Sequence, residues 1–182
     1  MKRYGVEIPH ARHVALLSLT LYDHLQPLAG VPSAEPWRDY LETAALLHDI
    51  GYFIAKKGHH RHSRWILENT YETQAWLEGT RQWVADLAYF HRKPLSVKKA
   101  QYLAQTPGLW ALSFILRIAD GLDRSHRQDV SIEQVAVSDK TIAIKVSHLS
   151  DDDYRHLMES KAQGFRQAFA RNLKIKRLEA GA

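Results

Sequence analysis

Histidine and aspartate side chains offer the clearest chemistry in this sequence. His48 and Asp49 stand side by side after an apolar run, and 11 histidines are many for 182 residues. An imidazole nitrogen and a carboxylate oxygen together suit zinc, manganese, iron or magnesium better than a metal that prefers thiolates. The same pair could also be a helix-end histidine followed by a capping aspartate. A metal site therefore requires further ligands from other elements.

Two predicted helices point histidines toward one core. Apolar residues recur at spacings of three and four from Val14 to Leu25, and His10 lies one turn earlier on the same face. A second helix, predicted from Trp37 onward, carries His48 on its apolar face. We therefore expect His10 and His48 to face inward together.

Later segments add three candidate ligands. His59 opens a third predicted helix, and His91 closes a fourth. Asp120 falls on the apolar face of a fifth helix, where an unpaired carboxylate would be costly to bury. A cation would offset that cost, and so would an arginine such as Arg117 or Arg124.

Six residues thus form a candidate metal site, with His48 and Asp49 at its catalytic centre. Each has a structural alternative, such as a core histidine held by a hydrogen bond. His60 and His62 are alternatives to His59, because helix boundaries inferred from sequence shift by about a turn. The six candidates are His10, His48, Asp49, His59, His91 and Asp120.

The spacing of apolar residues changes in the last third of the chain. Alternating apolar residues on both sides of residues 138–140 predict a β-hairpin. A long amphipathic helix is expected next, capped by the aspartates at 151–153 and carrying its apolar face as far as Leu173. The alternation of basic and apolar residues over 174–177 suggests a third strand.

Length and composition limit the architecture and the partners. We expect a mainly α protein, with a helical metal-binding domain over residues 1–128 and an α+β appendage, a β-hairpin plus a long helix, over 129–182. The lack of cysteine excludes disulfides, thiolate zinc sites and cysteine nucleophiles. The net charge of +5 favours anionic partners, but neither a helix-turn-helix signature nor a dense basic stripe points to nucleic acid. The apolar run near the N-terminus is too short to span a membrane, so a cytoplasmic protein is expected.

Several short motifs resemble the HD-domain metal-dependent phosphohydrolases. They are a histidine four residues before Val-Ala, then Leu-Leu-His-Asp-Ile-Gly at 46–51, then Ile-Ala-Asp at 118–120. The first histidine of that family matches His10, its His-Asp pair matches 48–49, and its distal aspartate matches Asp120. His59 and His91 match two further histidines of dinuclear members. The resemblance implies a helical bundle that holds two divalent ions, whether Mn, Fe, Co, Ni, Zn or Mg, with Asp49 as the bridging carboxylate.

A closer resemblance covers nearly the whole chain. Ala-Ala-Leu-Leu-His-Asp-Ile-Gly, Gly-His-His-Arg-His-Ser, His-Arg-Lys at 91–93, Ile-Ala-Asp-Gly-Leu-Asp-Arg at 118–124 and the hairpin are similar to the C-terminal half of exopolyphosphatase/guanosine-pentaphosphatase family proteins. In that family catalysis belongs to N-terminal actin-like domains, and the HD-like half is associated with binding long anionic polymers and with dimerisation. The resemblance therefore implies either an active HD enzyme or a non-catalytic polyphosphate- or nucleotide-binding module that can form a homodimer.

Five cations beside the candidate ligands could hold substrate phosphates, with arginine binding two oxygens at once and lysine acting as a point charge. A standard alarmone hydrolase is disfavoured, because the acidic pair expected after the His-Asp is replaced by Gly-Tyr-Phe-Ile. A cyclic-dinucleotide phosphodiesterase is disfavoured because no Gly-Tyr-Pro follows His91. We expect hydrolysis of a phosphate ester or anhydride of the nucleotide or polyphosphate class. The five cations are Lys57, Arg61, Arg92, Lys93 and Arg124.

Overall fold

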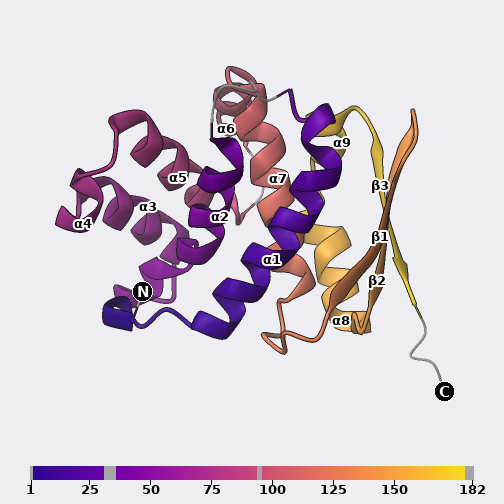
Figure 1. Cartoon of the computed structure of the whole chain (residues 1–182), viewed down its shortest axis with the longest axis horizontal. Coiled ribbons are helices and arrows are strands. Elements are labelled where there is room, and N and C mark those ends of the chain that lie inside the picture. Colours follow the sequence, from indigo (N-terminus) through magenta and orange to yellow (C-terminus); the bar gives the residue numbers. More distant parts are fainter. Residues whose placement is uncertain (1, 31–35, 94–95, 179–182) are drawn as a thin grey trace.

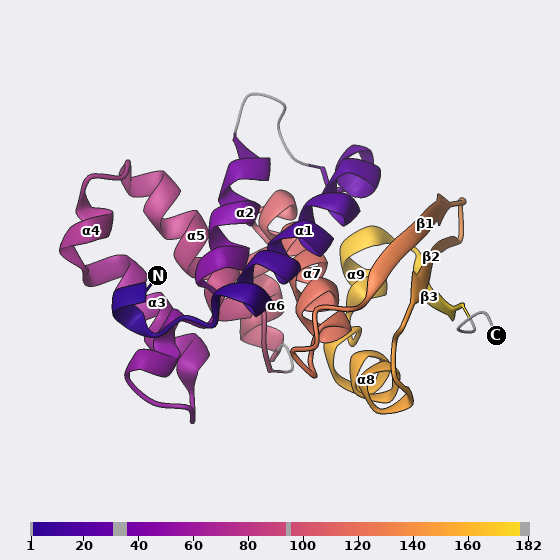
Figure 2. The ribbon, with the colours of Figure 1, turned by 60° about the horizontal axis from the view of Figure 1, so that its bottom comes forward.

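A computed structural model describes residues 2–30, 36–93 and 96–178 of the chain. Figures 1 and 2 show a helical body with a small sheet at one end. The predicted helices are all present in the body, and its described residues also form two shorter α-helices. The helices of the body are α1 (Ile8–Leu25), α2 (Trp37–Leu47), α3 (His59–Asn69), α4 (Tyr71–Gln74), α5 (Glu78–Phe90), α6 (Val97–Ala104) and α7 (Pro107–Leu122).

Helix α7 is the centre of the body. Every residue from Ala111 to Ala119 is buried, including the single charged one, Arg117. A helix that is buried on all sides must be covered by several neighbours, and α1, α2, α5 and α6 all contact it. The helix that carries Asp120 is therefore enclosed by other helices of the body.

The candidate ligands lie at helix ends that meet on one side of the body. His10 is in the first turn of α1, His59 is the first residue of α3, and Asp120 is in the last turn of α7. His48 and His91 directly follow α2 and α5. In Figure 1, α1 begins and α2 and α7 end toward the bottom of the view, so chain direction alone brings these residues to one face.

The C-terminal part contains the predicted hairpin and third strand. Strands β1 (Ser131–Val137) and β2 (Thr141–Ser147) are antiparallel, and β3 (Asn172–Arg177) runs parallel to β2. The side chains of Ile142, Ile144 and Val146 are buried in alternation along β2. One face of the sheet therefore packs against the protein, as the period of two requires.

The prediction of one long C-terminal helix is wrong. The chain forms α8 (Asp151–His156), a π-helical turn (Leu157–Lys161), a break, and α9 (Phe165–Phe169). Gly164 has a φ of 91°, and a Cβ there would lie 2.9 Å from Phe114 Cζ. This close approach to α7 requires glycine and ends the helix. Ser150, rather than an aspartate, caps α8, because its Oγ accepts a hydrogen bond from Asp153 N–H at 3.2 Å.

The prediction of a mainly α fold with a C-terminal strand-and-helix appendage is confirmed. Leu173, expected on the last helix, lies instead in β3. None of the helices within the described ranges is both long and apolar enough to cross a membrane.

Candidate metal centre and phosphate pocket

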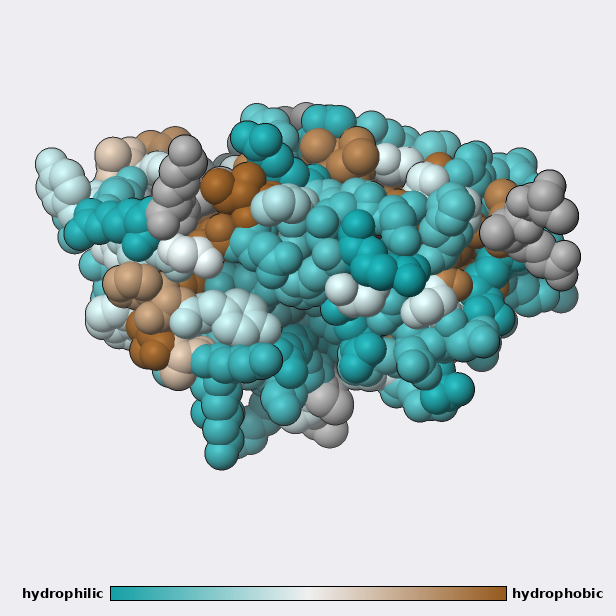
Figure 3. All heavy atoms as spheres, turned by 90° about the horizontal axis from the view of Figure 1, so that it is seen from below, coloured by the Kyte–Doolittle hydropathy of each residue, from teal (hydrophilic) through white to brown (hydrophobic). Residues whose placement is uncertain are grey.

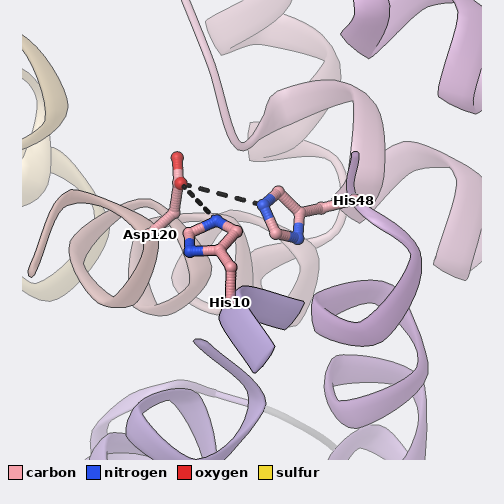
Figure 4. Close-up of side chains that lie close together, drawn as sticks. All are labelled: His10, His48 and Asp120. Carbon is pink, nitrogen blue, oxygen red and sulfur yellow. Dashed lines mark ion pairs between the residues drawn. The ribbon is translucent and has the colours of Figure 1, made fainter. Parts of the chain in front are cut away.

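Three buried ligand groups form the first triad, which Figure 4 shows. His10 Nε2 and His48 Nε2 each lie 3.7 Å from Asp120 Oδ1. The rings of His10 and His48 meet edge to face, with centroids 5.3 Å apart. One ligand atom from each residue lies within 4.8 Å of the other two, so a single ion could contact all three.

A second triad lies beside the first and contains Asp49, His59 and His91. Asp49 Oδ1 is 3.0 Å from His59 Nε2 and 3.7 Å from His91 Nε2. The two Nε2 atoms are 3.3 Å apart. These three residues also offer ligand atoms that are mutually within 4.8 Å.

Asp49 joins the two triads. Its Oδ2 atom is 3.4 Å from His48 Nε2 and 4.0 Å from His10 Nε2, while Oδ1 faces the second triad. Each carboxylate oxygen thus faces a different pair of histidines, as a bridging ligand would. The structure brings all six sequence-derived candidates together. It does not bring His60, whose ring packs near Tyr89, into any triad.

Backbone carbonyls help to fix the orientation of three of the four histidines. Nδ1 of His48, of His59 and of His91 lies within hydrogen-bond distance of a carbonyl oxygen three residues back, one of the carbonyls that a helix end or turn leaves free. Nδ1 of His59 also lies 3.2 Å from Arg92 Nη1. Because a carbonyl can only accept, Nδ1 of His48 and of His91 carries a proton, and the Nε2 atoms of these rings face the centre. The accepting carbonyls belong to Ala45, Lys56 and Ala88, at 2.7, 3.2 and 2.6 Å respectively.

The donor set fits a divalent cation. Among the described residues, the Nε2 atoms of His10 and His48 are buried without a hydrogen-bond partner. A buried polar atom left unpaired is costly, so two such atoms aimed at one point need an explanation. Imidazole nitrogens with carboxylate oxygens form a ligand set that Zn, Mn, Fe, Co and Ni accept.

Charge is concentrated at this centre. Burial lowers the pKa of His48, but Asp49 and Asp120 outweigh burial and raise it to about 9. Burial and the nearby His48 lower the pKa of His91. Burial would raise the pKa of the Asp49 carboxyl, yet the facing histidines hold it well below its usual range. Two ionised carboxylates in a buried cluster therefore attract positive charge.

A cavity of about 640 Å³ opens over both triads. Figure 3 shows a hollow in the largely hydrophilic face on this side of the molecule. Three of the predicted phosphate-binding cations, Arg92, Lys93 and Arg124, line the cavity, whereas Lys57 and Arg61 do not. Two cations that were not predicted also line it, Lys56 and Lys161.

A comparison with protein-family models matches residues 1–162 to the family described as Ppx/GppA phosphatase, domain III. The chain belongs to this family. The match confirms the resemblance to the C-terminal half of exopolyphosphatase/guanosine-pentaphosphatase proteins. It includes all six candidate ligands and Lys161, so the two triads lie within the matched part of this Ppx/GppA domain III chain.

Asp123 is a site residue that the sequence reasoning missed. Its buried Oδ2 accepts a hydrogen bond from His10 Nδ1 at 2.8 Å, and its Oδ1 accepts one from Gln128 N–H at 2.8 Å. Asp123 therefore fixes the orientation of the His10 ring, as backbone carbonyls do for the other three histidines. Its position three residues after Asp120, directly after the end of α7, was the available signal.

Lys161 is the second missed residue, and it corrects an expectation about Asp120. Its ammonium group donates to Asp120 Oδ2 and, at 3.1 Å, to the carbonyl of His91. Neither suggested arginine pairs with Asp120. Arg117 donates to backbone carbonyls only, and Arg124 donates to Asp153 at 3.3 Å. Lys161 comes from the appendage, 41 residues away along the chain, so local spacing could not reveal it.

Proposed function

We propose that this Ppx/GppA domain III chain is a divalent-metal-dependent phosphohydrolase that cleaves a phosphate ester or anhydride. The observation that carries the proposal is the carboxylate of Asp49, which turns one oxygen to His10 and His48 and the other to His59 and His91. Asp120 completes the first set of ligands. This arrangement would hold two ions, with Asp49 shared between them.

The chain's own residues have distinct parts in such a reaction. Bound divalent ions would supply Lewis acidity, which neutralises phosphate charge and acidifies water. Arg92 and Arg124 would bind phosphate oxygens in pairs, and Lys93 would attract them as a point charge. Asp123 keeps His10 in the tautomer whose Nε2 faces the centre.

Metal analysis joined to a phosphatase screen tests this proposal. Protein purified without chelator should carry about two divalent ions per chain and release phosphate with Mn, Co, Ni or Mg. Asp49→Asn should lose most of the bound metal and most of the phosphatase activity. Asp139→Asn, in the exposed hairpin turn, should keep the metal and the activity. The proposal fails if the wild type holds less than about one ion per chain and Asp49→Asn changes no activity.

A second candidate function is a non-catalytic anion-binding module. The observation in its favour is Lys161, which already supplies positive charge to Asp120 and lines the cation-rich cavity. In that case polyphosphate should bind in the presence of chelator, and the binding should weaken as salt rises. Loss of binding in Lys93→Ala with no turnover in the wild type would favour the module, and sedimentation would show whether it forms a homodimer.

A further inference from the structure

A second cavity opens beside the one that covers the triads. It has a volume of about 390 Å³, within the range of roughly 300–1,000 Å³ typical of small-molecule sites. Asp49, Tyr52, Lys56 and His126 line both cavities. The two cavities therefore meet at the carboxylate that joins the triads, and one ligand could occupy both.

The two cavities differ in charge. Five lysines and arginines line the larger cavity. Only one, the shared Lys56, lines the second, which also contains the carboxylates of Glu7 and Asp49. Val6 and Ala11, both buried, contribute apolar surface there. A chain of phosphates suits the larger cavity, whereas the second suits a neutral group.

Two partly exposed rings stand between the cavities. The ring of His126 is stacked on His10, with centroids 3.7 Å apart and planes 4° apart. Tyr52, 37% exposed, is stacked on His59 at 4.2 Å. In each case a candidate ligand covers one side of the ring, which leaves the partly exposed ring able to contact another flat group.

The position of His126 is held by several contacts. Its Nδ1 lies 2.7 Å from Glu7 Oε2, and its backbone N–H donates to Asp123 O at 2.9 Å. Its φ of 55° lies in the left-handed region, which a non-glycine residue adopts only where its surroundings impose it. The loop after α7 is therefore shaped so that this ring lies over His10.

We infer that the second cavity binds the flat base of a nucleoside phosphate while the phosphate group lies in the larger, cation-lined cavity. The inference rests on the proposed function and selects among its substrates, because a linear polyphosphate has no neutral flat group to place there. Stacking on aromatic side chains tolerates every base. The site would therefore select nucleotides as a class rather than one particular base.

Equilibrium binding to the full chain tests the inference without requiring turnover. The probes are adenosine monophosphate, guanosine monophosphate, inorganic phosphate and tripolyphosphate, each with and without manganese. Both nucleotides should bind at least about fivefold more tightly than inorganic phosphate, the factor expected from one base stacked on an aromatic ring. Nucleotide affinity no greater than that of inorganic phosphate would overturn the inference.

Variants then locate the base. Val6→Phe, which fills the second cavity, and Tyr52→Leu, which removes a stacking ring from the surface, should each lower the ratio of nucleotide to tripolyphosphate affinity about fivefold or more. Val137→Phe, on the exposed hairpin, is the matched control and should leave the ratio unchanged. If Val6→Phe does not fold, the affinity ratio of Tyr52→Leu alone tests the base site. An unchanged ratio in the folded variants contradicts the base site.

The outcome separates this inference from the hydrolase proposal. Selective nucleotide binding without phosphate release would keep the base site and reject hydrolysis. Phosphate release with equal affinity for nucleotides and inorganic phosphate would keep hydrolysis and reject the base site.

Discussion

The ammonium group of Lys161 donates to Asp120 Oδ2, while Oδ1 of the same carboxylate lies 3.7 Å from Nε2 of both His10 and His48. Lys161 also donates to the carbonyl of His91. One side chain from the C-terminal appendage therefore holds a residue of each triad. The appendage thus contributes directly to the geometry of the candidate centre.

Removal of this ammonium group should lower the stability of the folded protein. In Lys161→Met, Asp120 keeps a buried carboxylate without its cation, so we expect the free energy of unfolding in chelator to fall by about 3–5 kcal/mol. Urea denaturation followed by tryptophan fluorescence measures the change. Lys174→Met, on the exposed side of β3, should stay within about 0.5 kcal/mol of the wild type. Equal stability of both variants would show that the ion pair contributes nothing.

Gly51 should not tolerate a side chain. A Cβ at this position would lie 2.1 Å from His59 O and 2.4 Å from Ser63 N, both backbone atoms of α3. We expect Gly51→Ala to lower the free energy of unfolding by about 3 kcal/mol or more, because the turn after His48 must move away from α3. Calorimetry measures the loss as a lower Tm.

Gly79→Ala is the matched control for this substitution. The nearest atom to its new Cβ is Trp83 Nε1, at 3.9 Å in the first turns of α5. Stability should be unchanged or rise by up to about 1 kcal/mol, because alanine favours the helix. A similar Tm for the two variants would mean that the contact between Gly51 and α3 does not constrain the fold.

The helices and the candidate ligands were predictable because both depend on local spacing. His10 and His48 continue apolar stripes whose period of 3.6 residues is visible in the sequence. His59 and His91 lie where such stripes begin or end. The packing of the helices then brings these helix ends together at the candidate centre.

The partners of these ligands were not predictable in the same way. Lys161, which pairs with Asp120, ends a π-helical turn, and the chain then breaks at Gly164, which lies close to Phe114. The apolar spacing before and after Gly164 is compatible with one continuous helix. Tertiary contact, rather than local preference, decides the break, so both the broken helix and the buried lysine required the structure.

Arg117 should be a major source of stability. It is fully buried in α7, and its guanidinium group donates to four carbonyl oxygens, those of Phe90, Lys93, Ser160 and Lys161. Arg117→Met would leave these carbonyls unpaired, so we expect the free energy of unfolding to fall by about 3 kcal/mol or more. Arg12→Met, on the exposed side of α1, should change it by less than about 0.5 kcal/mol. Urea denaturation of the two variants compares them directly, and equal midpoints would contradict the role.

Tyr102 should make stability depend on alkaline pH. Its hydroxyl group donates to Asp86 Oδ2 at 2.5 Å, and burial together with this carboxylate raises the pKa of Tyr102 to about 12. The unfolded chain has a tyrosine pKa of about 10. The folded protein therefore holds this proton more tightly, and the stabilisation is complete below about pH 10 and lost as the pH rises through 12.

The free energy of unfolding should consequently fall more steeply above pH 10 in the wild type than in Tyr102→Phe. Because Tyr102 is 40% exposed, solvent screening should limit the difference to about 1 kcal/mol. Urea denaturation at intervals from pH 8 to about 11.5 measures both curves. Tyr71→Phe, at a position that is 86% exposed, should follow the wild type throughout. Parallel curves for the wild type and Tyr102→Phe would show that the bond to Asp86 does not hold the tyrosine proton.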